Sequence, residues 1–195
     1  RILNPKTLGH PKFDLCNKPI LNYYSKEIME IKKKYKKFVF FSSSFGSDQI
    51  IQKHLYDSYI LKNLQNDNYK NKKEVIIERK REHIDYIKSI NIIKKLAKSY
   101  PNINFVFRPH PRQNINLVKK RFKKIKNIFV IYKYTTIPWI EACEVYMHAG
   151  CTTLFEAITL RKKIIFYYEN LKKFRPQLFY NFGKNFNNEK LLSKK

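Results

Sequence analysis

Short apolar runs alternate along this chain with longer segments whose apolar residues recur at helical spacing. Phe38–Phe41 is the first clear run, and it stops at the polar residues Ser42–Ser44. Similar runs follow at Ile103–Phe107, Phe129–Tyr132, Glu144–His148 and Lys163–Tyr167. Because parallel neighbours need a crossover connection, strands separated by helices predict a parallel sheet with helices on both faces. The predicted fold class is α/β, with a Rossmann-like sheet.

The segments between these runs give the predicted domain organisation. Helices are expected over 26–35, 48–64, 78–99, 115–125 and 154–160, with a short one beginning at 135–138 and a polar loop over 66–73. We expect a junction segment and first helix over 1–36, one Rossmann-like domain over 37–180, and a polar C-terminal tail over 181–195.

Composition agrees with a folded domain. The 195 residues are 43% hydrophobic, which is enough for a core that a disordered basic tail lacks. No apolar run approaches the roughly 18 residues of a membrane span. The chain begins Arg1-Ile2-Leu3-Asn4-Pro5, neither a signal peptide nor an initiator Met, so we expect a fragment of a longer protein.

The formal net charge of +26 admits two interpretations. The chain has 33 Lys and 8 Arg in scattered clusters, a profile that AT-rich codon choice produces and that favours ordinary solvated faces. The alternative is an anionic partner such as a nucleotide, a lipid headgroup or nucleic acid, whose binding would be salt-sensitive. Because bidentate recognition of phosphates and bases prefers Arg, nucleic acid is not the expected partner.

Cysteine usage indicates a reducing compartment. Cys16, Cys143 and Cys151 form no Cys-x-x-Cys pair, and an odd count excludes a complete disulfide framework. Cys143, His148 and Cys151 lack a nearby fourth ligand for structural zinc, so no metal is expected. A nucleophilic Cys151 is equally disfavoured, since most small buried cysteines are inert.

Unusual residues gather where the predicted strands end, the edge at which open α/β sheets bind ligands. After the fourth strand, Gly150 permits a sharp turn, and Thr152 and Thr153 offer hydroxyls beside a helix start, an arrangement that suits phosphate. Glu156 would then reach ribose hydroxyls or cap the helix. A plain capping box of Thr153 with Glu156 is the alternative.

The second strand runs into Arg108-Pro109-His110-Pro111. The two prolines restrict the backbone, so His110 is presented at a fixed angle, and Arg108 adds a fork of donors for the same anion. The alternative is structural: His110 caps the loop and Arg108 pairs with a carboxylate. Trp139 would stack on a base or, as is more common, lie in the core.

Several motifs resemble one family. Leu8–Asp14, Phe107–Pro111, Trp139–Ala142 and His148–Ala157 occur in the order found in bacterial surface-carbohydrate biosynthesis proteins, over about residues 7–169. These proteins look like GT-B type glycosyltransferases, distantly similar to bacterial sialyl- and Kdo-transferases and to glycerophosphotransferases of teichoic acid assembly. The first motif departs from the usual Gly-Asn-Pro by carrying His10.

The resemblance implies the C-terminal, nucleotide-binding half of a two-domain enzyme that transfers a sugar from a nucleotide donor to a glycan or lipid-linked acceptor. It implies that Arg108 and His110 contact phosphate, that Thr152 and Thr153 bind it through hydroxyls and amides, and that Glu156 holds ribose. It also gives weaker support to His148 at the strand end, beside the Gly150 turn.

The resemblance implies no cofactor, because related transferases without a metal stabilise the leaving phosphate with helix ends and basic side chains. The catalytic base would come from the other half of the enzyme. We expect a cytoplasmic protein, and its charge suits peripheral contact with an anionic membrane. Two alternatives stay open: a basic nucleic-acid-binding module, and a catalytically silent GT-B half or epimerase.

Overall fold

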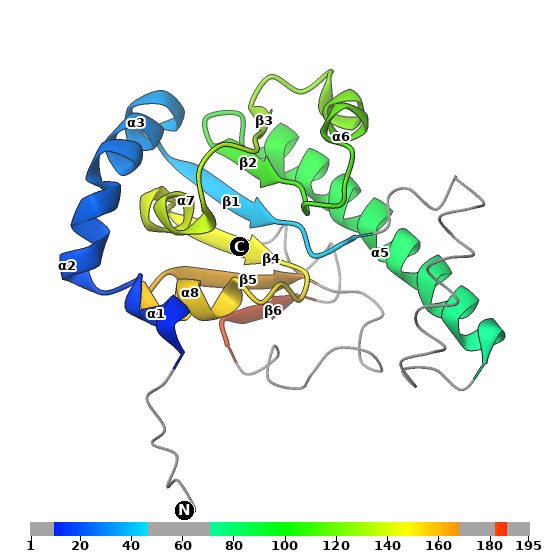
Figure 1. The fold of residues 1–195 in the computed structure, drawn as a ribbon. Helices are drawn as coiled ribbons and strands as arrows, with labels where there is room; N and C mark the ends of the chain where they lie inside the picture. The colour runs from blue at the N-terminus through cyan, green and yellow to red at the C-terminus, as the bar shows by residue number, and fades with distance from the viewer. Residues whose placement is uncertain (1–9, 47–70, 168–181, 187–195) are drawn as a thin grey trace, which may run out of the picture.

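The computed structural model describes residues 10–46, 71–167 and 182–186 (Figure 1). The helix expected over 48–64 lies outside these residues. Six strands form one sheet: β1 (Phe38–Ser42), β2 (Asn104–Arg108), β3 (Ile128–Val130), β4 (Val145–His148), β5 (Lys163–Tyr167) and β6 (Lys184–Phe186). Their order is β3-β2-β1-β4-β5-β6, and every neighbouring pair is parallel. The order reverses between β1 and β4, which makes this the switch point of the sheet.

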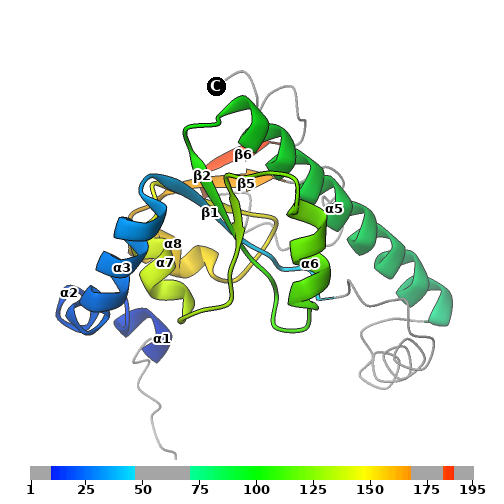
Figure 2. The ribbon, with the colours of Figure 1, turned by 90° about the horizontal axis from the view of Figure 1, so that it is seen from above.

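Helices cover both faces of the sheet, as Figure 2 shows. On one face lie α3 (Ser25–Tyr35), α7 (Thr136–Ala142) and α8 (Leu154–Thr159), and on the other lie α5 (Lys72–Ser99) and α6 (Ile115–Phe122). Alternation along β1 explains both cores, because Phe38 and Phe40 pack under the first group and Phe41 under the second. The predicted Rossmann-like α/β class is confirmed.

Local signals set the helix ends. The side chain of Asn71 accepts from the backbone N–H of Glu74 at the start of α5, and Asn114 caps α6 by accepting from two backbone N–H groups. Helix α5 therefore begins at Lys72, inside the segment expected to be a polar loop and ahead of the expected start at 78. Strand β3 ends at Val130 rather than at Tyr132.

Two segments hold more structure than the sequence indicates. The junction segment contains three short helices, α1 (Pro11–Asp14), α2 (Lys18–Leu21) and the 3-10 helix η1 (Asn22–Tyr24). Within the expected C-terminal tail, residues 184–186 form β6, which pairs in parallel with β5. Residues 184–186 therefore belong to the sheet, because β6 continues it beyond β5.

Trp139 belongs to the core and is 1% exposed. Its ring packs against Tyr35, Phe38 and Phe40, and its indole N–H donates to the carbonyl of Lys133 at 2.7 Å. The core interpretation is confirmed, and base stacking by this side chain is excluded by its burial. No helix in the described part of the chain is long and apolar enough to cross a membrane.

Candidate functional site

The loops that follow β1 and β4 are bonded to each other at the switch point. The hydroxyl of Ser44 donates to the carbonyl of Ala149 at 3.1 Å, and the Ser42 Oγ lies 3.6 Å from the Cys151 Sγ. Neither the Ser42–Gly46 loop nor the Ala149–Thr153 loop carries a charged side chain. The edge at which doubly wound sheets bind ligands is therefore lined by hydroxyls, a thiol and backbone groups.

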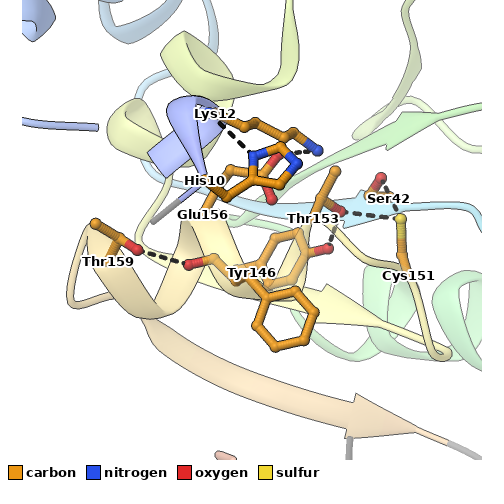
Figure 3. A network of polar contacts seen from close by, with 9 residues as sticks. His10, Lys12, Ser42, Tyr146, Cys151, Thr153, Glu156 and Thr159 are labelled. Carbon is orange, nitrogen blue, oxygen red and sulfur yellow. Dashed lines mark hydrogen bonds and ion pairs between the residues drawn. The ribbon is translucent and has the colours of Figure 1, made fainter. Parts of the chain in front are cut away.

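A chain of hydroxyl and thiol contacts continues under these loops (Figure 3). The Thr153 hydroxyl donates to the Cys151 Sγ at 3.0 Å and lies in a short hydrogen bond with the Tyr146 hydroxyl. Burial is the main cause that raises the pKa of Tyr146 well above its usual value, so this phenol stays protonated. The Thr153 hydroxyl is engaged inside the protein, whereas Thr152 is exposed to solvent.

Gly150 makes the turn that the sequence predicts. Its φ of 90° lies in the region that favours glycine, and its N–H donates to the Nδ1 of His148 at 3.2 Å. His148 itself is 0% exposed and stacks between Tyr146 and Phe166, with ring centroids 5.4 and 4.8 Å away. His148 is therefore a core side chain that supports the turn, and its burial does not favour direct contact with a ligand.

Glu156 is fully buried and pairs with a residue from another helix. Its Oε1 lies 2.8 Å from the Nζ of Lys12 on α1, and the Lys12 side chain is 43% exposed (Figure 3). Apart from this ion pair, neither carboxylate oxygen accepts a hydrogen bond from the described residues. Thr153 precedes α8 without a side-chain cap, so the capping-box alternative is wrong.

Helix α1 is held against α8 by this ion pair and by an aromatic contact. The ring of Phe13 meets the ring of Phe155 edge-on at 6.1 Å, and His10 caps α1 by accepting from the N–H of Lys12 at 3.1 Å. Lys12 lies within the first motif of the sequence, yet its partner is far away in the chain. The spacing of residues gives no signal for such a pair, so sequence reasoning missed it.

Arg108 ends β2 and holds the loop after β3. Its two terminal nitrogens donate to the carbonyls of Lys133 at 3.1 Å and Tyr134 at 2.8 Å, and its guanidinium lies 5.0 Å from the centre of the Tyr132 ring. The fork is thus aimed at backbone carbonyls, neither at a carboxylate nor at an anion-binding loop. Contact with phosphate stays a prediction for this residue.

His110 lies beside the β1 loop, and its backbone N–H donates to Gln113 while its Nδ1 accepts from the N–H of Arg112 at 3.2 Å. A methyl group built on Gly46 would lie 3.7 to 3.8 Å from Arg112 and His110. The pKa of His110 is lowered, mainly by burial and next by the positive charge of Arg112. The negative charge of Glu82 opposes this shift.

The β1 loop connects the two predicted halves of the site without bringing them into contact. Its first residues meet the Ala149–Thr153 loop, and a methyl group built on its last described residue, Gly46, would contact His110. Among the described residues no contact joins His110 to Thr152 or Thr153. Their convergence on one anion therefore stays a prediction.

A separate hollow of about 670 Å³ lies away from the strand ends. It is lined by α2, η1, α3 and Glu141 of α7, and none of the predicted site residues reaches it. Across the described residues, no three His, Cys, Asp or Glu side chains gather as metal ligands would. The Cys143 thiol donates to the carbonyl of Ile140 instead.

No protein-family model matches the chain, and no curated protein matches it. Among solved structures it resembles UDP-GlcNAc 2-epimerase from Methanocaldococcus jannaschii, with a TM-score of 0.52 and 15% identity over 97% of this chain. The same enzyme in complex with UDP-GlcNAc and UDP gives a TM-score of 0.53, also at 15% identity. The beta Kdo 2,7 transferase KpsC of Thermosulfurimonas dismutans is less similar, with a TM-score of 0.39, 14% identity and coverage of 78% of this chain and 44% of that one.

At these identities the likeness shows the fold alone, a Rossmann-like α/β fold. The chain spans about half the length of the epimerase, 47% in the unliganded structure and 46% in the complex.

Proposed function

We propose that this chain is the nucleotide-sugar-binding half of a GT-B type enzyme of surface polysaccharide biosynthesis, which transfers the sugar to a glycan or lipid-linked acceptor. The observation that carries the proposal is the bonded pair of loops after β1 and β4, at the switch point of a sheet in the Rossmann strand order. Open α/β sheets bind their ligands at this position. The resemblance of the motifs to surface-carbohydrate enzymes supplies the substrate class.

Each residue of the site would have a distinct role. Thr152 would give its exposed hydroxyl to phosphate, and the Gly150 turn would let the backbone come close to it. Glu156, whose Oε2 accepts no hydrogen bond from the described residues, would receive a ribose hydroxyl once α1 gives access to it. His110 would donate to the phosphate from the neighbouring loop. The chain requires no cofactor in this proposal.

Calorimetry with CMP, CDP and UDP tests the proposal. We expect the chain to bind at least one of them, and His110→Ala or Thr152→Ala to weaken binding by more than about tenfold, the loss of one charge-assisted hydrogen bond. Thr159→Ala is the matched control, because this exposed threonine lies at the last residue of α8 and its hydroxyl donates to the carbonyl of Phe155 at 2.9 Å. Absence of binding for all three nucleotides would refute the proposal.

An epimerase is the second candidate, and the fold likeness to UDP-GlcNAc 2-epimerase favours it. The two activities differ in their products, since a transferase joins the sugar to an acceptor and an epimerase releases an altered nucleotide sugar. Incubation of the intact parent protein with UDP-GlcNAc, with and without a glycan acceptor, separates them. A silent GT-B half would bind the nucleotide and yield neither product.

A further inference from the structure

The described loops that lead into the strands are strongly basic. Because the strands are parallel, the residues just before each strand meet at one edge of the sheet. Exposed cations lie there just before β1 and β3 and at the start of β5, and we call this surface the basic edge. Its members are Lys36, Lys37, Lys123, Lys124, Lys126, Arg161 and Lys163. In the described connections into strands, Glu144 before β4 is the one carboxylate.

Backbone contacts fix these loops side by side. The N–H of Asn104 donates to the carbonyl of Lys37 at 3.2 Å, and the N–H of Phe105 donates to the carbonyl of Asn127 at 2.8 Å. On the other side of β1, Val39 is in register with Val145, which is in register with Lys163. The basic edge therefore extends from β3 to β5, four strand spacings or about 19 Å.

At the opposite edge, the described residues include one lysine. The described residues of the loops after β1 and β4, 42–46 and 149–153, carry no charged side chain, and the described connections after β2 and β3 contribute Arg108, Arg112 and Lys133. The seven exposed cations of the basic edge give it a concentration of positive charge that suits an anionic partner.

We propose that the basic edge docks this protein on an anionic lipid bilayer, with the candidate nucleotide site at the far end of the sheet. Its cations are lysines with one arginine, and a lysine ammonium is a hydrated point charge suited to diffuse attraction by headgroups. The exposed tyrosines of the described residues, Tyr23 and Tyr132, lie outside it, so it offers no aromatic platform on which bases could stack.

The size of the effect follows from the number of charges. Each basic residue near an anionic surface strengthens partitioning by about fivefold, the equivalent of ~1 kcal/mol. Neutralising four lysines of the basic edge should weaken partitioning on the order of 100-fold or more. The attraction falls off within a Debye length of about 10 Å at 0.1 M salt, so high salt should release the protein.

Co-sedimentation of the full chain with vesicles tests the proposal. The probe is a phosphatidylcholine vesicle with or without phosphatidylglycerol, at low and at high salt. The test variant is Lys36→Gln/Lys37→Gln/Lys124→Gln/Lys126→Gln. The control, Lys18→Gln/Lys26→Gln/Lys73→Gln/Lys80→Gln, lowers the net charge equally at exposed positions away from the basic edge. We expect the test variant to lose the binding to anionic vesicles and the control to change it by less than about fivefold.

The proposal is overturned if the wild-type chain does not bind anionic vesicles, or if both variants lose vesicle binding equally. It is also overturned if the wild-type chain binds single-stranded RNA but not vesicles, and the test variant loses the RNA binding. The last would make the basic edge a nucleic-acid surface. Calorimetry with nucleotide on the same variants keeps this result separate from the proposed function. A chain that binds vesicles but no nucleotide would refute only the latter.

Discussion

The carboxylate of Glu156 depends on a single cation from a different helix. Lys12→Met removes that partner and leaves a buried charge, so we expect the free energy of unfolding to fall by about 2 kcal/mol. The loss should be smaller than for a fully buried pair, because the Lys12 side chain is 43% exposed. Urea unfolding followed by circular dichroism measures it.

Two further variants show whether the loss comes from the ion pair. Lys18→Met, at an exposed position of α2, should cost less than about 0.5 kcal/mol. Adding Glu156→Gln to Lys12→Met should restore part of the stability, because an uncharged amide replaces the unpaired carboxylate. Equal instability of the single and double variants would show that α1 matters only through its apolar contacts with α8.

The three thiols should differ in reactivity. Burial is the main cause that raises the pKa of Cys16 to about 11 and of Cys143 to about 12, so at pH 8 almost none of either is thiolate. Cys151 is half-buried at the candidate site. We expect iodoacetamide at pH 8 to modify Cys151 at least about tenfold faster than the other two, as peptide mass spectrometry would show, and the gap to narrow as pH rises.

Cys151→Ser is the control for this labelling. It should leave only slow modification in the folded chain and rapid modification of Cys16 and Cys143 after denaturation. Rapid labelling of Cys16 in the folded chain would instead show that α1 opens readily, since Cys16 is 5% exposed when α1 is in place.

Sequence reasoning predicts side chains whose role is local better than those whose role depends on distant partners. The positive φ of Gly150 follows from one residue type in one turn, and it is found. The motifs assign Arg108 and Glu156 to a ligand, but in the structure Arg108 donates to carbonyls of the β3 loop and Glu156 pairs with Lys12 of α1. A motif identifies a candidate side chain but does not show which distant group in the fold that side chain contacts.

At the scale of elements, β6 depends on a glycine. Gly183 has a φ of 79°, and a methyl group built on it would lie 2.5 Å from the carbonyl oxygen of Ile164 and 2.8 Å from its Cβ. Both atoms belong to the rigid β5, so the clash cannot relax through a flexible side chain. Gly183→Ala should therefore lower the free energy of unfolding by about 3 kcal/mol, or undock β6.

Gly46→Ala is the matched control for this change. Its added methyl group would meet only side-chain atoms, the nearest at 3.7 Å on Arg112, which is ordinary contact. We expect a change within about 1 kcal/mol, measured by the same thermal or urea unfolding. Amide hydrogen exchange of β5 would show whether β6 has left its edge in the Gly183→Ala chain.

Strands and helices are predicted well from the sequence where apolar periodicity is strong. They are missed where an element forms only because it pairs or packs with another element. The five apolar runs all become strands, and no strand end differs from its predicted position by more than two residues. Strand β6, Lys-Asn-Phe, has no apolar run and exists because β5 offers it a free edge. The short helices before Ser25 likewise depend on packing, because one turn of helix is not stable by itself.

At the scale of the whole molecule, the parallel sheet separates two candidate surfaces. The candidate nucleotide site lies where the strands end, and the basic edge lies where they begin. The alternation of strands and helices predicts the fold class. It does not predict the basic edge, which becomes visible only when loops distant in the chain are placed at the same edge of the sheet.

This separation predicts that the two surfaces bind independently. None of the described residues belongs to both surfaces, so binding at one edge should have little effect on binding at the other. Free-energy changes at distant sites usually add within about 0.5 kcal/mol. The nucleotide Kd, measured by calorimetry with and without saturating anionic vesicles, should therefore change by less than about threefold, and the basic-edge variant should bind nucleotide as the wild type does. A larger change would mean that docking moves a loop of the site, with Gly46 and His110, which join the β1 and β2 loops, as the first contacts to examine.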